Sequence, residues 1–127
     1  MTDAAALMYT AEHEWVAVAD GVATFGVTDY AAGQLGDVVY VDLPAQGAEI
    51  TAGQVCGEIE STKSVSEIYS PVTGRVLEIN GDVDADPALV NADPFGRGWL
   101  VRVALSGPAP AGLLDEEAYR RLTGESA

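Results

Sequence analysis

The sequence is poor in the residues that most metal sites and acid–base active sites use. It has one cysteine (Cys56) and one histidine (His13) in 127 residues. A single cysteine excludes an internal disulfide framework. A single histidine excludes a metal site built from several histidines and leaves little for acid–base chemistry. We therefore expect no metal site and no catalytic residues of the usual kinds.

Positive charge is also scarce. Six basic residues, of which only Lys63 is lysine, face 20 acidic ones, and the formal net charge is −14 at pH 7. Phosphate recognition needs a basic face, so this balance argues against nucleic-acid binding, and it disfavours docking on anionic membranes. Repulsion between like-charged copies favours a monomer.

Long hydrophobic stretches are missing as well. No apolar run approaches the length that spans a bilayer. The N-terminal stretch MTDAAALMYTAEHEW lacks the basic segment followed by an apolar stretch that marks a signal peptide. A soluble cytoplasmic protein is therefore expected, and 127 residues suit one domain that holds its own core.

Short strand patterns fill most of the chain. The expected strands cover 15–19, 22–27, 37–43, 54–60, 65–69, 75–79 and 98–105, and 45–54 is expected to form loops. Asp20-Gly21 is a typical tight-turn pair for a hairpin between the first two strands. In the strand 54–60, Val55 and Ile59 are expected on the same face. Many short strands punctuated by glycine and proline favour a small β barrel or sandwich with peripheral helices.

Helical patterns occur at three places, which are 28–36, 87–91 and 113–122. Thr28 is expected to cap the first helix, which should end near Gly33 or Gly36. The last helix follows a linker at 106–112 and is expected to begin at Asp115 and stop at Gly124. The side chains of this helix expected to face the body are Leu114, Ala118 and Leu122.

The one lysine lies at the apex of a predicted hairpin, where Thr62 and Lys63 join the strands 54–60 and 65–69. Its neighbours are small and polar, so the amine should be exposed. An exposed lysine has a pKa near 10.4 and is a poor nucleophile at neutral pH. It can serve as the target of a modifying enzyme that brings an activated acyl group. The residues alone also allow a solvated turn lysine with no role, which is the commoner case.

The other distinctive side chains have structural explanations. His13 is expected to make a satisfied hydrogen bond or to lie at the surface. Cys56 fits a small half-buried packing residue, and no spacing logic pairs it with His13 as a nucleophilic dyad. Trp15 and Trp99 are expected to pack in or against the core. The glycine clusters do not match a phosphate loop, because no Gly-Lys-Ser/Thr follows them.

Several stretches, in the same order along the chain, resemble the glycine cleavage system H protein family. They are HEW at 13–15, GVTDYAAGQLGDVVYVDLP at 26–44, ESTKS at 60–64, SPVTGRV at 70–76, NADPFGRGW at 91–99 and LLDEEAY at 113–119. The resemblance runs from about Tyr9 to Leu122. Lipoyl domains of 2-oxoacid dehydrogenases and biotin carrier domains share the hairpin lysine but lack HEW and LLDEEAY. ESTKS departs from the commoner ESVKA by two small changes, at Thr62 and Ser64.

The resemblance implies a fold that is mainly β. This is a lipoyl/biotinyl-carrier-like barrel-sandwich hybrid of two antiparallel sheets, with short peripheral helices and a C-terminal helix. It implies one lipoyl-carrier domain over residues 1–127, with its core at about 9–105 and the C-terminal helix at about 113–122.

The resemblance also implies a covalent carrier subunit that is not itself an enzyme, with lipoic acid in amide linkage on Lys63. The carrier would take the aminomethyl group of glycine from a pyridoxal-phosphate glycine decarboxylase (P protein) to an aminomethyltransferase (T protein). Dihydrolipoyl dehydrogenase (L protein) would reoxidise the carrier, and a lipoate-attaching enzyme would modify it. A tethered arm raises the effective concentration of the reactive group at each partner, and the hard chemistry belongs to the cofactor and the partners.

The loaded arm would carry a positive charge, and carboxylates suit it. By the same resemblance, Glu14 and Glu67 are the best candidates to line a cleft for it, and Glu12 is a weaker one. All three also fit solvated surface charges. Three other functions stay open: an H-like relay supplying lipoate to 2-oxoacid dehydrogenases, an acidic interaction module whose Lys63 is never modified, and an enzyme that uses Cys56.

Overall fold

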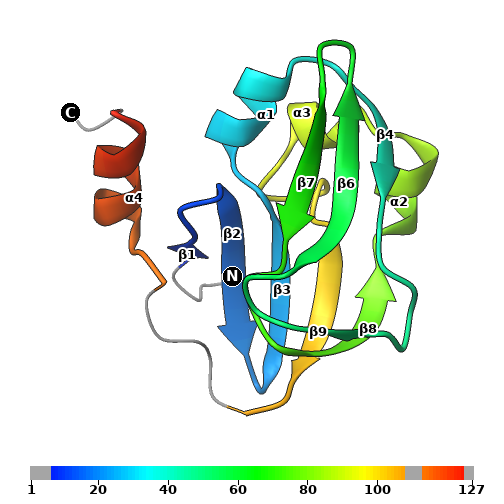
Figure 1. Cartoon of the computed structure of the whole chain (residues 1–127), viewed down its shortest axis with the longest axis vertical. Helices are drawn as coiled ribbons and strands as arrows, with labels where there is room; N and C mark the ends of the chain where they lie inside the picture. The colour runs from blue at the N-terminus through cyan, green and yellow to red at the C-terminus, as the bar shows by residue number, and fades with distance from the viewer. Residues whose placement is uncertain (1–6, 108–112, 125–127) are drawn as a thin grey trace.

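Two antiparallel sheets form the body of the protein. The structure is a computed structural model that describes residues 7–107 and 113–124, so most of the expected linker at 106–112 lies outside the described residues. The larger sheet has the strand order β1-β2-β3-β9-β8-β5, and the smaller has the order β4-β6-β7 (Figure 1). In the part of the chain that is described, neither sheet closes on itself into a barrel.

The strands are β1 Met8–Tyr9, β2 Glu14–Ala19, β3 Val22–Val27, β4 Val38–Asp42, β5 Glu49–Ile50, β6 Val55–Ser61, β7 Val65–Tyr69, β8 Gly74–Ile79 and β9 Val101–Leu105. The helices are α1 Asp29–Leu35, α2 Gly81–Ala85, α3 Leu89–Ala92 and α4 Glu116–Thr123. The expected fold class, mainly β with two antiparallel sheets and short peripheral helices, is confirmed.

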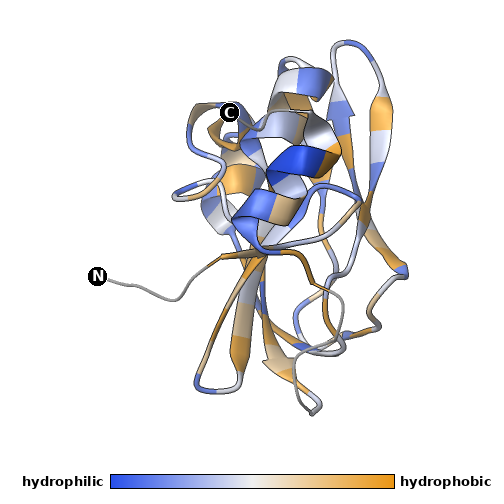
Figure 2. Ribbon diagram, turned by 90° about the vertical axis from the view of Figure 1, so that its left-hand side faces the viewer, coloured by the Kyte–Doolittle hydropathy of each residue, from blue (hydrophilic) through white to orange (hydrophobic). Residues whose placement is uncertain are grey.

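The core lies between the two sheets. Ile59 and Ile68 of the smaller sheet are buried in the same cluster as Phe25 and Val103 of the larger one. Figure 2 shows hydrophobic bands along the strands and hydrophilic residues gathered on the helices and turns. Burial of these side chains supplies most of the driving force that holds the sheets together.

The β2–β3 hairpin turns at Asp20 and Gly21, as the sequence predicts. Both residues have positive φ, 54° and 77°. A two-residue turn with φ positive at both positions has the backbone twist that matches antiparallel strands. Ala19 and Val22, the residues on either side of this turn, are partners in the antiparallel pairing of β2 with β3.

Four elements of the structure differ from the prediction. The loop segment 45–54 contains the two-residue strand β5, which pairs with β8. The last strand begins at Val101 rather than at residue 98, because the N–H of Gly98 donates to the carbonyl of Asp93 instead of to a neighbouring strand. The short strand β1 and the helix α2, which begins at an Asn80 cap, were not predicted.

Val55 does not share the buried face of Ile59. Val55 is 48% exposed, and Ile59 is 1% exposed. The cause is a register shift in the β6–β7 pairing between Val55 and Gly57, which turns the start of β6 over. Strict alternation along β6 therefore holds only beyond the bulge.

The first helix begins and ends near its predicted residues. The Thr28 hydroxyl accepts a hydrogen bond from the N–H of Ala31 at 3.1 Å, which caps α1. The helix ends at Gly36, whose φ of 77° suits glycine. Gly33 lies inside the helix, so of the two predicted ends Gly36 is the correct one.

The C-terminal helix α4 has the predicted caps, Asp115 and Gly124, and Leu114 packs against the body as expected, but Leu122 does not. Leu122 is 52% exposed, whereas Tyr119 is fully buried. The ring of Tyr119 stacks on the ring of Tyr9, with centroids 4.8 Å apart. The helix packs through this aromatic pair, which turns Leu122 toward solvent.

Candidate functional site

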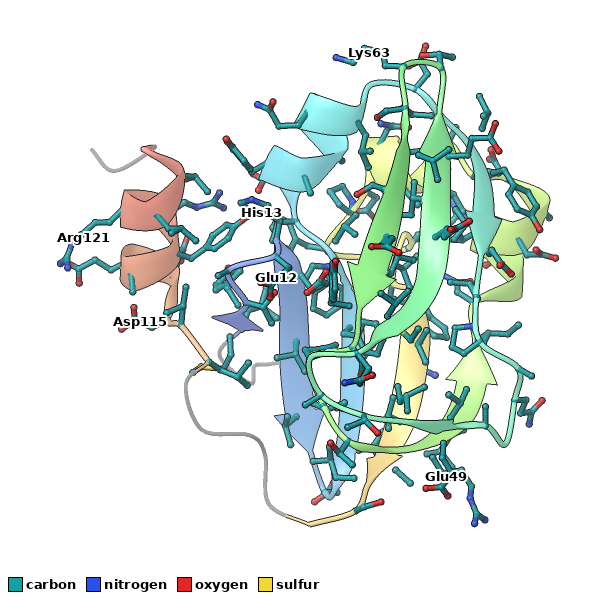
Figure 3. The ribbon with its side chains drawn as sticks, viewed as in Figure 1. Glu12, His13, Glu49, Lys63, Asp115 and Arg121 are labelled. Atoms are coloured by element: carbon teal, nitrogen blue, oxygen red, sulfur yellow. The ribbon has the colours of Figure 1, made fainter. Side chains whose placement is uncertain are left out.

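The β6–β7 hairpin projects from one end of the molecule, and Lys63 lies at its tip (Figure 3). The N–H of Ser61 donates to the carbonyl of Ser64 at 2.8 Å, which closes the turn. Thr62 and Lys63 are therefore the two apex residues, as predicted. Lys63 is exposed, so an enzyme can reach its amine.

The turn is held by the buried hydroxyl of Ser61. Its Oγ accepts hydrogen bonds from the N–H groups of Lys63 and Ser64, each at 3.1 Å, and donates to the Ser64 carbonyl. The N–H of Thr62 donates to the Asp37 carbonyl at 3.0 Å. The apex is thus ordered by the hairpin itself and anchored to the connection that follows α1.

The stem of Lys63 lies beside the end of α1. A Cβ at Gly36 would be 3.4 Å from Cε of Lys63, so the absence of a side chain at Gly36 leaves room for the stem. The side chain of Lys63 therefore lies over the connection between α1 and β4.

A pocket of about 410 Å³ opens along β7, below the apex. It is bounded by the turn before β2, the helix α1 and the hairpin. Its lining residues are Glu12, His13, Glu14, Val27, Tyr30, Ala31, Gln34, Leu35, Ile59, Ser64, Val65, Ser66, Glu67 and Ile68. One wall is apolar, and three carboxyl groups contribute to the rest. The structure therefore brings Glu12, Glu14 and Glu67 to one cavity, and their role in it is a prediction.

Glu14 is the most unusual of these acids because it is 2% exposed. Its carboxylate accepts hydrogen bonds from the Thr10 hydroxyl at 2.6 Å and from the N–H of Tyr69 at 3.3 Å. Burial raises the pKa of Glu14 to about 7, although both hydrogen bonds act in the opposite direction. Glu14 is thus close to the point where it gains or loses its charge at neutral pH.

Glu67 and Glu12 are exposed members of the pocket lining. Glu67 accepts a hydrogen bond from the Tyr69 hydroxyl at 3.1 Å, and this bond raises the pKa of Tyr69. Glu12 precedes His13 in the turn that leads into β2 (Figure 3). The pocket lining therefore includes one buried carboxyl group and two that face solvent.

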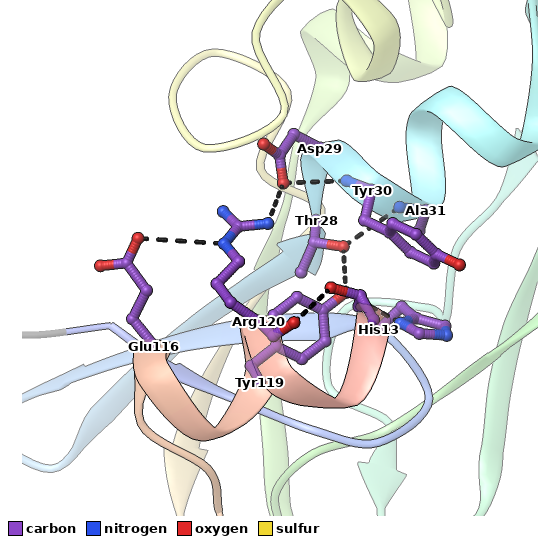
Figure 4. Close-up of polar contacts among 9 residues, drawn as sticks. His13, Thr28, Asp29, Tyr30, Ala31, Glu116, Tyr119 and Arg120 are labelled. Atoms are coloured by element: carbon purple, nitrogen blue, oxygen red, sulfur yellow. Dashed lines mark hydrogen bonds and ion pairs between the residues drawn. The ribbon is translucent and has the colours of Figure 1, made fainter. Parts of the chain in front are cut away.

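His13 is half-buried and hydrogen-bonded, which matches the structural interpretation of the sequence. Its Nδ1 lies 2.8 Å from the Tyr119 hydroxyl, and that hydroxyl lies 2.7 Å from Oγ1 of Thr28 (Figure 4). Burial lowers the pKa of His13, while the nearby Glu12 acts to raise it. Sequence reasoning missed Tyr119 and Thr28 as neighbours of the pocket.

Cys56 and the tryptophans occupy structural positions. Cys56 is packed against the core, and burial raises the pKa of its thiol to about 12. A thiol with this pKa stays protonated at neutral pH, which argues against a nucleophilic role for Cys56. Trp15 is buried and its Nε1–H donates to the Pro94 carbonyl at 2.8 Å, while Trp99 packs against the second apolar cluster, to which Trp15 belongs.

Two further searches covered only the described residues. They contain no group of three histidine, cysteine, aspartate or glutamate side chains arranged to hold a metal ion. Their helices include none with the length and apolar character needed to cross a membrane.

Two antiparallel sheets, a projecting hairpin and one lysine at its apex define a carrier domain of the lipoyl/biotinyl type. A model of the family "Glycine cleavage H-protein" matches residues 7–126. The chain belongs to the glycine cleavage H-protein family.

Individual relatives agree with this assignment. The chain is 60% identical over 116 residues to the glycine cleavage system H protein of Beutenbergia cavernae, covering 91% of each. It is 57% identical over 125 residues to that of Clavibacter sepedonicus, covering 98% of this chain and all of the relative. The crystal structure of the Mycobacterium marinum H protein superposes with a TM-score of 0.89 at 39% identity, covering 96% of this chain and 99% of that one.

Proposed function

We propose that this chain is the lipoyl carrier of the glycine cleavage system, with lipoic acid in amide linkage on Lys63. The observation that carries the proposal is the position of the only lysine of the chain, exposed at the apex of an ordered hairpin in a member of this family. Membership of the family favours glycine cleavage over a role as a lipoate relay.

The residues present fit a lipoyl group. The apex offers an exposed primary amine on a turn that Ser61 holds in shape. The pocket beside it has an apolar wall suited to an aliphatic arm, formed by Val27, Leu35, Ile59 and Ile68. Its carboxylates suit an amine that is positively charged at the end of that arm.

Lipoic acid, when bound, would supply a disulfide that is reduced as it takes up the aminomethyl group of glycine and that stays on the arm as a dithiol once the group has been passed on. The residues of the chain would hold and shield what the arm carries. Glu14 and Glu67 would accept hydrogen bonds from the cationic amine, with Glu12 as a weaker third partner. The apolar wall would keep water from a labile cargo.

Carrier function also fits the poverty of catalytic side chains. The chemistry would be performed by a pyridoxal-phosphate glycine decarboxylase, an aminomethyltransferase and dihydrolipoyl dehydrogenase, the P, T and L proteins of the system. A lipoate-attaching enzyme would act on Lys63. The chain would supply position and a tether.

The test is a change of the acceptor. Lys63→Arg keeps the charge but cannot form the amide, so glycine–bicarbonate exchange with the decarboxylase should vanish. Lys63→Arg combined with Arg97→Lys, which moves the only lysine to another exposed site, is the matched control. Mass spectrometry of the protein from its native host should show a lipoyl increment on the Lys63 peptide and none on the double variant. Exchange that persists in Lys63→Arg would overturn the proposal.

A further inference from the structure

Exposed apolar side chains gather on the smaller sheet. Among the described residues, the large apolar side chains that are exposed are Val39, Tyr40, Val55, Val65, Leu77 and Leu122, and the first four belong to β4, β6 and β7. In Figure 1 the smaller sheet lies in front of β3 and β9, so that one of its sides packs on the core and the other faces solvent. We call the solvent side of β4 and β6 the outer face and define it by Val39, Tyr40, Asp42, Glu58 and Glu60.

Strand pairing and a bulge place an apolar patch on this face, close to the apex. Tyr40 is paired with Glu60, and Glu60 is paired with Val65. A register shift between Val38 and Tyr40 leaves two consecutive residues of β4 in solvent, Val39 at 51% and Tyr40 at 54% exposed. A bulge re-aims side chains in this way. A contiguous exposed apolar patch is typical of an interaction surface, and tyrosine is enriched in such surfaces.

The next row on the same side of the sheet consists of acids. Asp42 is paired with Glu58, and Glu58 is paired with Glu67, and all three residues are exposed. Like charges directly opposite each other on neighbouring strands destabilise a sheet. Asp42, Glu58 and Glu60 form no ion pair within the described part of the chain, whose ion pairs involve other acids. The fold thus keeps a repulsion that a basic partner surface would offset.

The outer face and the pocket lie toward opposite edges of the smaller sheet. β7 borders the pocket, and β4 is the other edge strand. None of the five residues that define the outer face lines the pocket. A protein bound to the outer face can therefore reach the apex and still leave the pocket open.

We propose that the outer face is the surface on which the glycine decarboxylase docks. The decarboxylase would hold Tyr40 in an apolar contact ringed by arginine or lysine side chains, which complement the acids around Tyr40. The choice of partner rests on the proposed function. The aminomethylated arm must return to the pocket as soon as it is loaded, which requires an open pocket. The aminomethyltransferase has to draw the arm out of the pocket, so it should cover the pocket side instead.

Two variants, each with a matched control, test the surface with purified decarboxylase. Tyr40→Ala removes the exposed ring, and Glu58→Lys reverses one charge of the acidic row. Their controls are Leu77→Ala, an exposed apolar residue of β8, and Glu49→Lys, at the opposite end of the molecule (Figure 3). In glycine–bicarbonate exchange, each test variant should raise the KM for the lipoylated carrier about ten-fold and leave kcat close to wild type, because the lost contacts hold the carrier and do not touch the reacting atoms. The KM of each control should stay within about two-fold of wild type.

Two further measurements make the comparison independent of the arm and specific for the partner. The Kd of the decarboxylase for the unlipoylated carrier should also rise about ten-fold in both test variants. The KM of the aminomethyltransferase for the loaded carrier should stay within about two-fold of wild type. Glu58→Lys relieves a like-charge row, so it should fold at least as stably as wild type and keeps the test open if Tyr40→Ala does not fold.

Unchanged KM and Kd values in a folded test variant overturn the proposal, as do equal changes in the controls. An equal rise in the KM of the aminomethyltransferase overturns the choice of partner. A wild-type dimer that Tyr40→Ala dissociates would assign the face to a second copy of the chain and also overturn the proposal. Failure of the proposed function would instead appear in the wild type itself, as an unmodified Lys63 and no exchange, before any variant is compared.

Discussion

Glu14 is a carboxyl group that the fold holds almost out of contact with water. Its pKa is about 7 in the folded protein, against an ordinary value of 4.5. The folded state therefore binds this proton more tightly than the unfolded chain does. Stability from this group is present at low pH and is lost as the pH rises from about 4.5 to about 7, because the buried acid must then ionise.

We expect Glu14→Gln to remove this loss. One pKa unit corresponds to about 1.4 kcal/mol, so Glu14 should lower the free energy of unfolding of the wild type by roughly 2–3 kcal/mol between about pH 5 and pH 8. Denaturant titrations at several pH values measure it. The variant should show a flatter pH profile, and Glu67→Gln, on the exposed side of the same pocket, should keep the wild-type slope. Parallel profiles for Glu14→Gln and the wild type would contradict the expectation.

Single residues of the site differ in how far they could be predicted. Lys63 was predicted as the site because it is unique in the chain and lies between two strand patterns, and the carboxyl groups, which line one pocket, were predicted through family resemblance. Tyr119 was not, because its hydrogen bonds join residues 91 and 106 positions apart. Such bonds depend on where α4 packs, which no local pattern encodes. The available signal was an aromatic ring in a helix otherwise rich in charge.

The hairpin turn is an element whose order depends on one hydroxyl. Ser61 is 7% exposed and bonds the backbone on both sides of the apex lysine. We expect Ser61→Ala to leave the N–H groups of Lys63 and Ser64 without this partner. The loss should cost about 1–2 kcal/mol locally and speed amide exchange at those two residues. Hydrogen exchange followed by NMR measures it.

Ser64→Ala is the control for that experiment. The backbone carbonyl of Ser64 bonds Ser61, and alanine keeps that carbonyl. Exchange at the apex should therefore stay close to wild type in Ser64→Ala. Equal protection of the apex amides in Ser61→Ala and the wild type would show that the strands alone order the turn.

Elements with a full period of side chains were predictable, and those without one were not. The strands β2, β3 and β7 match their predicted ranges to within one residue. The strands β1 and β5 have two residues each, too few to show alternation. The bulge at the start of β6 depends on pairing with β7 rather than on the sequence of β6 alone. The short strands and the bulge therefore depend on pairing between strands that are distant in the sequence, which the periodicity of a single segment does not show.

At the scale of the whole molecule, negative charge dominates, and the arginines do little to offset it. Arg75, Arg102, Arg120 and Arg121 each form an ion pair with an acidic side chain. Acylation of Lys63 would remove a further positive charge from a chain whose net charge is −14. A modified carrier would thus approach its partners with the apex flanked by acids and without the ammonium of Lys63.

The electrostatic field of this negatively charged surface should steer the carrier toward a basic rim around the active-site mouth of the decarboxylase. We expect the association rate to fall by about an order of magnitude between roughly 50 mM and 500 mM salt, because exposed charges are screened beyond a few ångströms at high salt. Stopped-flow mixing with the decarboxylase measures it. Glu60→Gln, on β6 next to the apex, should reduce this salt dependence, whereas Glu49→Gln, at the opposite end of the molecule (Figure 3), should leave it nearly unchanged. An association rate that does not change with salt would mean that the carrier finds its partner by shape and by the arm alone. Equal effects of the two variants would mean that the net charge, and not the position of the charge near the apex, governs the association.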